Sequence, residues 1–216
     1  MAQDRAPGEP WPDDLLLAAA VCREALLPAL GEDWSRPAGD LTWDCRRTLD
    51  HVVDALLFYT GQLTTRATRR LLRLRNGDSE RPVEELLEIV GTAAAVLAEI
   101  VRAAPAGTRA FHPAGMADGS GFVAMGCTEI LIHTDDIAQG LALPFRPPDA
   151  LTAVVLTRIF PWAPLKADPW AAFRWACGRA SLPDRDRLAP DWWWHCAPLS
   201  EWDGTRTVRT VPPGWS

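Results

Sequence analysis

The residues best suited to chemistry in this sequence are a glutamate and two histidines. Glu129 and His133 stand four residues apart in the apolar segment 122–143, so on a helix their side chains leave the same face about one turn apart. This spacing allows a carboxylate oxygen and an imidazole nitrogen to reach one cation. A third ligand must come from elsewhere, and His51 is the candidate, because metal sites in helical bundles take ligands from facing helices.

Two nitrogen ligands and one carboxylate suit a zinc ion and leave one coordination position for water or a substrate atom. Nickel, iron and manganese also fit such a set, since geometry and availability decide which metal binds. A thiol at the open position loses its proton readily and becomes a nucleophile at neutral pH. Water at that position becomes hydroxide, as in a hydrolase. The residue types therefore indicate metal chemistry and leave both reactions open.

Helix geometry sets a condition on this site. At about 100° per residue, Glu129 and His133 lie to one side of the apolar stripe of their helix, and His51 lies still further from its own stripe. Either the helix of His51 is covered on two sides, or the site lies at the open end of a bundle. Asp136 shares the face of the pair, where it is predicted either to orient an imidazole or to lie on a solvated acidic face.

The other histidines and the tryptophans are expected to be structural. His112 lies in the loop before segment 122–143, with a place at the mouth of a cleft as the alternative, and His195 follows three tryptophans. Most of the eleven tryptophans lie beyond residue 160, where they are expected to cover the core or, alternatively, to line a ligand cavity. No Ser-His-Asp or Cys-His arrangement stands out, so the sequence assigns no catalytic side chain.

Length and composition are those of an ordinary globular protein. The 216 residues suit one domain, or one domain with a small appendage, and 48% hydrophobic with 23% charged residues argues against disorder. The formal charge of −6 gives no reason to expect nucleic acid as a partner. One cluster of arginines is expected to be a solvated helix end, with an anion-binding rim as the alternative. Its members are Arg66, Arg69, Arg70, Arg73 and Arg75.

The sequence favours a cytoplasmic protein without a membrane partner. No stretch approaches the roughly 20 apolar residues that a membrane span needs. The first residues, MAQDRAPGEPWPDD, are acidic and rich in proline, unlike a secretory or transit peptide. The five cysteines are scattered without a CxxC pair, which favours a reducing compartment and argues against a cysteine zinc knuckle.

Four long patterns of apolar residues at helical spacing predict a mainly α protein, an antiparallel four-helix bundle. These helices are expected at residues 13–30, 43–67, 83–105 and 122–143. Beyond Pro147 we expect two short helices, near 149–160 and 168–180, followed by a short hairpin or an extended wrap. The predicted organisation is a flexible tail at 1–11, the bundle at 12–147 and a tryptophan-rich C-terminal extension packing on it at 148–216.

Two segments resemble a known family. LTWDCRRTLDHVVDALLFYTGQL (41–63) and GFVAMGCTEILIHTDDIAQGLAL (121–143) are similar to the DinB-like metalloenzyme superfamily, in particular to the branch of mycothiol-dependent maleylpyruvate isomerases. In that family a histidine early in the second helix and a Glu-x-x-x-His pair on the fourth bind zinc. The resemblance implies that His51, Glu129 and His133 are the ligands, and that mycothiol or a similar thiol is the cosubstrate. Related bundles often pair, which implies a homodimer.

The resemblance covers the bundle and not the rest of the chain. The region after Pro147 is short and does not match the larger C-terminal domain of the isomerase, so substrate residues cannot be carried over from there. The expected function is therefore a metal-dependent enzyme whose small thiol attacks a small electrophile, by isomerisation or S-transfer. The alternatives are a non-catalytic metal-binding or ligand-binding protein of a stress response, and a metal-dependent hydrolase, for which Asp54 and Asp136 are the nearest candidate bases.

Overall fold

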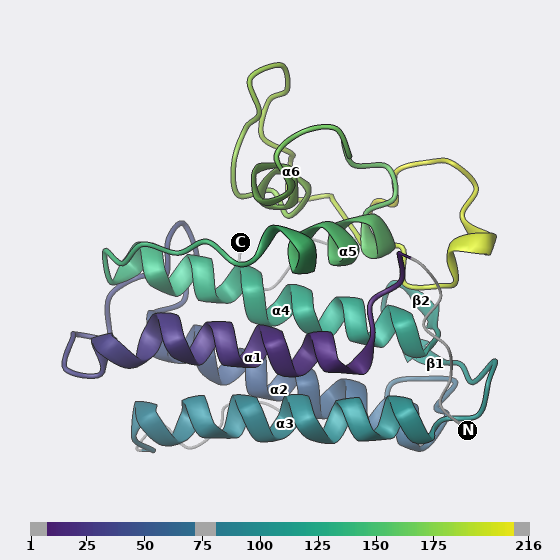
Figure 1. Ribbon diagram of the computed structural model, residues 1–216, viewed down its shortest axis with the longest axis horizontal. Helices are drawn as coiled ribbons and strands as arrows, with labels where there is room; N and C mark the ends of the chain where they lie inside the picture. Colours follow the sequence, from purple (N-terminus) through teal and green to yellow (C-terminus); the bar gives the residue numbers. More distant parts are fainter. Residues whose placement is uncertain (1–7, 72–80, 210–216) are drawn as a thin grey trace.

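The computed structural model describes residues 8–71 and 81–209, and within these ranges the protein is mainly helical, as predicted (Figure 1). Residues 1–7 of the predicted tail, Arg73 and Arg75 of the arginine cluster, and residues 210–216 lie outside the described ranges. Within them no helix is long and apolar enough to cross a membrane. The helices are α1 (Pro12–Leu26), α2 (Cys45–Thr64), α3 (Val83–Ala103), α4 (Gly119–Gly140), α5 (Asp149–Ile159) and α6 (Pro169–Ala176), with short 3-10 turns at Leu27–Ala29 and Leu199–Glu201.

The four long helices pack side by side, with α1 and α2 each lying against both α3 and α4 (Figure 1). Cys45 at the start of α2 lies 3.8 Å from the carbonyl oxygen of Ile137 near the end of α4, so these two helices are antiparallel. Arg46 at the start of α2 bonds to the carbonyl of Arg81 just before α3, so α2 and α3 run in the same direction. The predicted antiparallel arrangement therefore does not hold for every packed pair, since α2 and α3 begin at the same end of the bundle.

Aspartates fix the start of the two helices that carry the candidate ligands. The side chain of Asp44 accepts a hydrogen bond from the backbone N–H of Arg47 at 2.6 Å, at the N-terminus of α2. Asp118 accepts from the N–H of Gly121 at 2.8 Å, at the N-terminus of α4. Each carboxylate satisfies a backbone donor that has no partner within the helix.

Helix α4 is the central element, because every residue from Gly121 to Ala138 is buried. Helices α1 and α2 cover one side of it, and α5 lies along another, where the C-terminal segment also gathers (Figure 1). Protein therefore encloses the side chains of three acidic residues of α4, which are Glu129, Asp135 and Asp136.

The segment after α4 forms the two predicted short helices, and α6 packs on α5 (Figure 1). Near the end of the described chain, one antiparallel bridge joins Trp192 to Val208 in place of a longer hairpin. The expected loop before α4 instead contains a hairpin of two strands, β1 (Ala110–His112) and β2 (Gly115–Ala117).

A buried arginine ties this C-terminal segment to the start of α4. Arg158 of α5 is 0% exposed and donates to the Ser120 hydroxyl at 2.8 Å, to the Asp118 carboxylate and to the carbonyl of His195 at 3.2 Å. Its charge is thus paired and its donors are used, as a buried guanidinium requires. The contact fixes the C-terminal segment against the bundle.

Candidate metal centre

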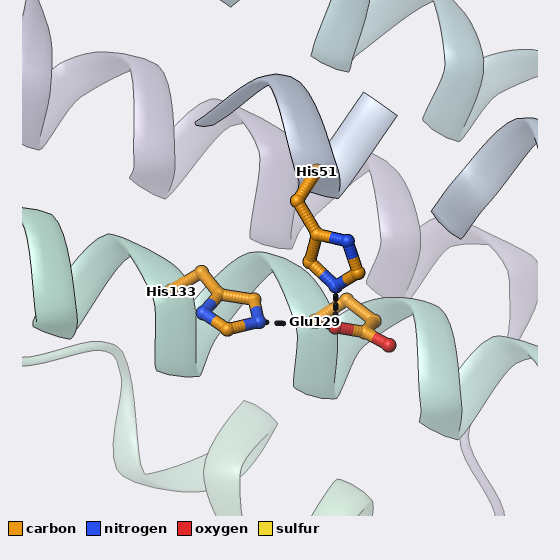
Figure 2. Close-up of side chains that lie close together, drawn as sticks. All are labelled: His51, Glu129 and His133. Atoms are coloured by element: carbon orange, nitrogen blue, oxygen red, sulfur yellow. Dashed lines mark ion pairs between the residues drawn. The ribbon is translucent and has the colours of Figure 1, made fainter. Parts of the chain in front are cut away.

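The structure brings the three predicted ligands together between α2 and α4. His51 comes from the second turn of α2, and Glu129 and His133 follow one another along the middle of α4 (Figure 2). Because α2 and α4 pack against each other, the imidazole of His51 reaches the carboxylate of Glu129 across the helix interface. The side chains of His133 and Glu129 are 3% and 8% exposed, whereas that of His51 is 20% exposed, so the group is reached from the side of His51.

The distances within the group suit a metal ion. Oε2 of Glu129 lies 3.5 Å from Nε2 of His51 and 3.3 Å from Nε2 of His133. One ligand atom from each of the three residues lies within 4.8 Å of the other two. Ligands held tetrahedrally at about 2.0–2.1 Å from a divalent metal are about 3.3 Å apart, so both distances from the carboxylate oxygen are compatible with ligands of one ion. The group is one that can hold a divalent metal.

The electrostatics of the group also favour a cation. Burial alone raises the pKa of Glu129, but hydrogen bonds from His133 and His51 outweigh it and hold that pKa far below its usual range. Burial lowers the pKa of His133, yet hydrogen bonding to Asp136 and Glu129 outweighs this and raises it. Both shifts have one cause, which is that the carboxylates attract positive charge to the imidazoles. A divalent ion supplies that charge at the same place.

Asp136 is the residue that orients His133. Its Oδ2 lies 3.0 Å from Nδ1 of His133, and its side chain is only 1% exposed. The alternative of a solvated acidic face is therefore wrong. An ionised carboxylate can only accept, so Nδ1 carries a proton, and in the neutral imidazole the lone pair is then on Nε2, on the side of Glu129. This is the tautomer that a metal at Nε2 requires.

Tyr59 holds the other oxygen of the glutamate. Its hydroxyl donates to Oε1 of Glu129 at 2.8 Å, which leaves Oε2 as the oxygen that faces both histidines. Sequence reasoning missed this residue. The available signal was that Tyr59 is the only tyrosine of the chain and lies about two turns after His51 in the same helix.

Arg179, also missed, holds Asp136 from the C-terminal segment. Its Nε and Nη2 donate to Oδ1 and Oδ2 of the carboxylate at 2.8 and 2.9 Å. The two residues are 43 positions apart in the sequence, and no motif links them. This contact arises only because the chain after α6 returns to the surface of α4.

His112 lies beside the group without belonging to it. Its ring is 5.5 Å from that of Tyr59 and 5.3 Å from that of Trp194, and its Nδ1 accepts a hydrogen bond from the N–H of Ala114 at 3.0 Å. Burial lowers the pKa of His112 to about 3, so its imidazole is neutral. His112 thus forms part of an aromatic wall that runs from Tyr59 to the C-terminal tryptophans.

His195 makes hydrogen bonds within the C-terminal segment and to α5. Its Nε2 lies 3.1 Å from the carbonyl oxygen of Pro198, and its backbone N–H donates to the carbonyl of Ile159. These contacts hold the C-terminal segment against α5. The imidazole is thus committed to local hydrogen bonding, which makes His195 a useful control for the two ligand histidines.

The five cysteines are free and buried. Burial raises the pKa of Cys22 and of Cys45 to about 11 and that of Cys196 to about 12, and it raises the values of Cys127 and Cys177 well above the ordinary range. Since the thiolate is the nucleophilic form, none of these side chains is a nucleophile at neutral pH.

The geometry thus establishes a buried group of one carboxylate and two imidazoles, with hydrogen-bond partners on Glu129 and His133 and an exposed edge at His51. The predicted membership of the DinB-like superfamily stays a prediction. No protein-family model, no curated protein and no solved structure matches this chain.

Proposed function

We propose that this protein is a divalent-metal enzyme, with zinc as the metal, that activates a small thiol for attack on a small electrophile. The observation that carries the proposal is the buried group of His51, Glu129 and His133, with its two spacings of 3.3 and 3.5 Å. A cation held by these three residues would lower the pKa of a coordinating thiol and so would supply a thiolate at neutral pH.

The side chains around the group have two further roles, which are to orient the ligands and to provide aromatic surface. Tyr59 and Asp136 keep the carboxylate and one imidazole in a fixed orientation, which reduces the reorganisation on metal binding. The ring centroid of Trp43 lies 5.0 Å from that of His51, and Tyr59, with His112 packed against it, contacts Glu129, so aromatic surface adjoins the group at two places. Such surface excludes water and suits the carbon skeleton of an organic electrophile.

The thiol in this scheme comes from outside the chain. The protein's own cysteines are buried with raised pKa values, so they do not compete as nucleophiles. Mycothiol is the thiol that the sequence resemblance favours. Its sulfur would add to an activated double bond and leave again, giving isomerisation, or would displace a leaving group, giving S-transfer. The partners are thus a small thiol and a small electrophile.

The proposal is tested by loading the protein with zinc and measuring consumption of an electrophile, such as maleylpyruvate or a chlorodinitrobenzene, with and without mycothiol. We expect turnover that requires both zinc and thiol, is lost in His51→Ala, and is retained in His195→Ala. In cobalt-loaded protein, thiol addition should produce a sulfur-to-cobalt charge-transfer band in wild type and not in His51→Ala.

Two other results would assign a different function. Hydrolysis that proceeds without thiol would indicate a metal-dependent hydrolase, although Asp136 is not free to act as its base because Arg179 and His133 occupy both oxygens. Stoichiometric metal binding without a thiol–cobalt band or thiol-dependent turnover would indicate a non-catalytic metal-binding protein.

A further inference from the structure

The contact between Arg179 and Asp136 extends the metal centre beyond the bundle. Arg179 lies three residues after the end of α6, in a turn where Gly178 has a φ of +65°. The guanidinium is fixed from two directions, because Nη1 donates to the carbonyl of Cys177 at 3.1 Å while Nε and Nη2 hold Asp136. The side chain is 8% exposed, so this arrangement is enclosed by protein.

Both carboxylate oxygens of Asp136 therefore accept hydrogen bonds. Oδ1 accepts from Nε of Arg179, and Oδ2 accepts from Nη2 of Arg179 and from Nδ1 of His133. Two parallel donors from a planar guanidinium prevent the carboxylate from rotating about its last bond. The direction of the lone pair of Oδ2, and with it the plane of the His133 imidazole, is set by the arginine.

Removing the arginine would leave a carboxylate with 1% side-chain exposure without its cation. A buried carboxylate that loses the guanidinium paired with it is unfavourable, and without the two parallel donors it is free to turn about its last bond. Such a turn weakens the hydrogen bond that holds the tautomer and orientation of His133. Arg179 thus acts on His133 through Asp136, which contacts both residues.

We propose that Arg179 is a positioning residue of the metal centre, so that the C-terminal segment sets the metal affinity of a site whose ligands all come from the bundle. This inference rests on the proposed function, because it assumes that His133 binds a metal. It assigns the segment after α6 a role in metal binding that the ligand residues themselves do not reveal.

A neighbouring ion pair provides a matched control. Arg174, in the last turn of α6, lies with its Nε 2.9 Å from Oδ2 of Asp135 on α4. This pair joins the same two parts of the molecule one position along α4, and the side chain of Asp135 is 7% exposed. The second partner of Asp135 is Gln139 at 2.8 Å, not a candidate ligand. Arg174→Met therefore removes an ion pair between the same two parts of the molecule without touching His133.

The test measures zinc affinity by competition with a chelator, using the full chain at fixed pH, for wild type and for Arg179→Met, Arg179→Lys and Arg174→Met. Losing a residue that orients a metal ligand costs roughly 10- to 100-fold in affinity, so we expect at least a tenfold loss in Arg179→Met. Arg179→Lys should lie between this variant and wild type, because an ammonium restores the charge but not the two parallel donors. Arg174→Met should stay within about twofold of wild type.

Two further readouts separate positioning from general stability. The unfolding temperature of the metal-free protein should fall in both Met variants. The visible spectrum of bound cobalt should change only in the Arg179 variants. Equal zinc affinity and an unchanged cobalt spectrum in Arg179→Met would overturn the proposal. If Arg179→Met does not fold, Arg179→Lys decides, and wild-type affinity with a wild-type cobalt spectrum in that variant would overturn it. Wild-type protein that binds no zinc would overturn the proposed function as well, which distinguishes the two failures.

Discussion

At the scale of single residues, hydrogen bonds hold two of the three candidate ligands, Glu129 and His133, in place. Tyr59 occupies one oxygen of Glu129, and Asp136 occupies one nitrogen of His133. The remaining oxygen and nitrogen face each other at 3.3 Å. This arrangement means that conservative changes next to the ligands should alter metal affinity without removing a ligand.

Tyr59→Phe is the sharpest such change, because it deletes one hydroxyl and leaves the ring in place. A buried oxygen of Glu129 then loses its donor, which should lower the free energy of unfolding by about 1–3 kcal/mol. The carboxylate also gains freedom to turn, so zinc affinity should fall by roughly tenfold. Chelator competition and chemical denaturation measure the two effects. Wild-type values in both would show that the hydroxyl does not position Glu129.

His112 gives a prediction for pH. Burial lowers its pKa in the folded protein to about 3, against a usual value of about 6.5. Above pH 6.5 the imidazole is neutral in both the folded and the unfolded state. Below it, only the unfolded state gains the proton, so the free energy of unfolding falls by up to about 1.4 kcal/mol per pH unit until about pH 3.

The variant His112→Asn removes this titration while keeping an oxygen that can accept from the N–H of Ala114. As the pH falls from 6.5 to 4, the free energy of unfolding of this variant should therefore decline less steeply than that of wild type. The comparison isolates residue 112, because the two proteins share all other titrating groups. Urea denaturation at several pH values provides the comparison. Parallel pH profiles would contradict a neutral, buried imidazole.

At the scale of elements, α4 shows what could be predicted from the sequence. The four-residue spacing of Glu129 and His133, and the position of Asp136 one turn on, follow from helix geometry alone. The helical wheel nevertheless placed this pair away from the apolar stripe. The reason is that α4 is covered on several sides, by α1 and α2 and also by α5, so its hydrophobic pattern has no single face. Coverage by a distant segment is not encoded in local spacing.

The close approach of the C-terminal segment to α4 depends on Gly121. A Cβ at this position would lie 2.2 Å from the carbonyl oxygen of Cys196 and 3.0 Å from Nη2 of Arg158. Gly121→Ala should therefore push the segment away and lower the free energy of unfolding by about 1–3 kcal/mol. Gly91→Ala in α3 is the control, because a Cβ there meets nothing within 4 Å.

The control should be neutral or stabilising by up to about 1 kcal/mol, since alanine favours a helix over glycine. Thermal or urea unfolding of the two variants measures the difference. A Gly121→Ala protein as stable as the Gly91→Ala protein would show that the segment is not seated tightly on α4.

At the scale of the whole molecule, the bundle supplies the ligands and the C-terminal segment completes their surroundings. The sequence predicted the ligand set and the helical class, but it did not predict Arg179, because the partner of that residue lies 43 positions away on another helix. It also did not predict the shared direction of α2 and α3, which local spacing does not encode. Both features are properties of the tertiary arrangement.

Metal binding should stabilise the whole fold, because the ligands come from two helices that must be packed for the site to exist. A free metal concentration of one hundred times the dissociation constant adds about 2.7 kcal/mol to the free energy of unfolding. We expect zinc to raise the unfolding temperature of wild type and of His195→Ala, and to have no effect on His51→Ala. A zinc-induced shift in all three proteins would indicate binding elsewhere.

The central claim, that His51, Glu129 and His133 hold a divalent metal, is tested most directly by elemental analysis of tag-free protein after zinc addition and dialysis. The account predicts about one zinc ion per chain in wild type and in His195→Ala, and loss of that ion in His51→Ala and His133→Ala. Wild-type protein that emerges from dialysis free of metal, or ligand variants that keep their zinc, would contradict it.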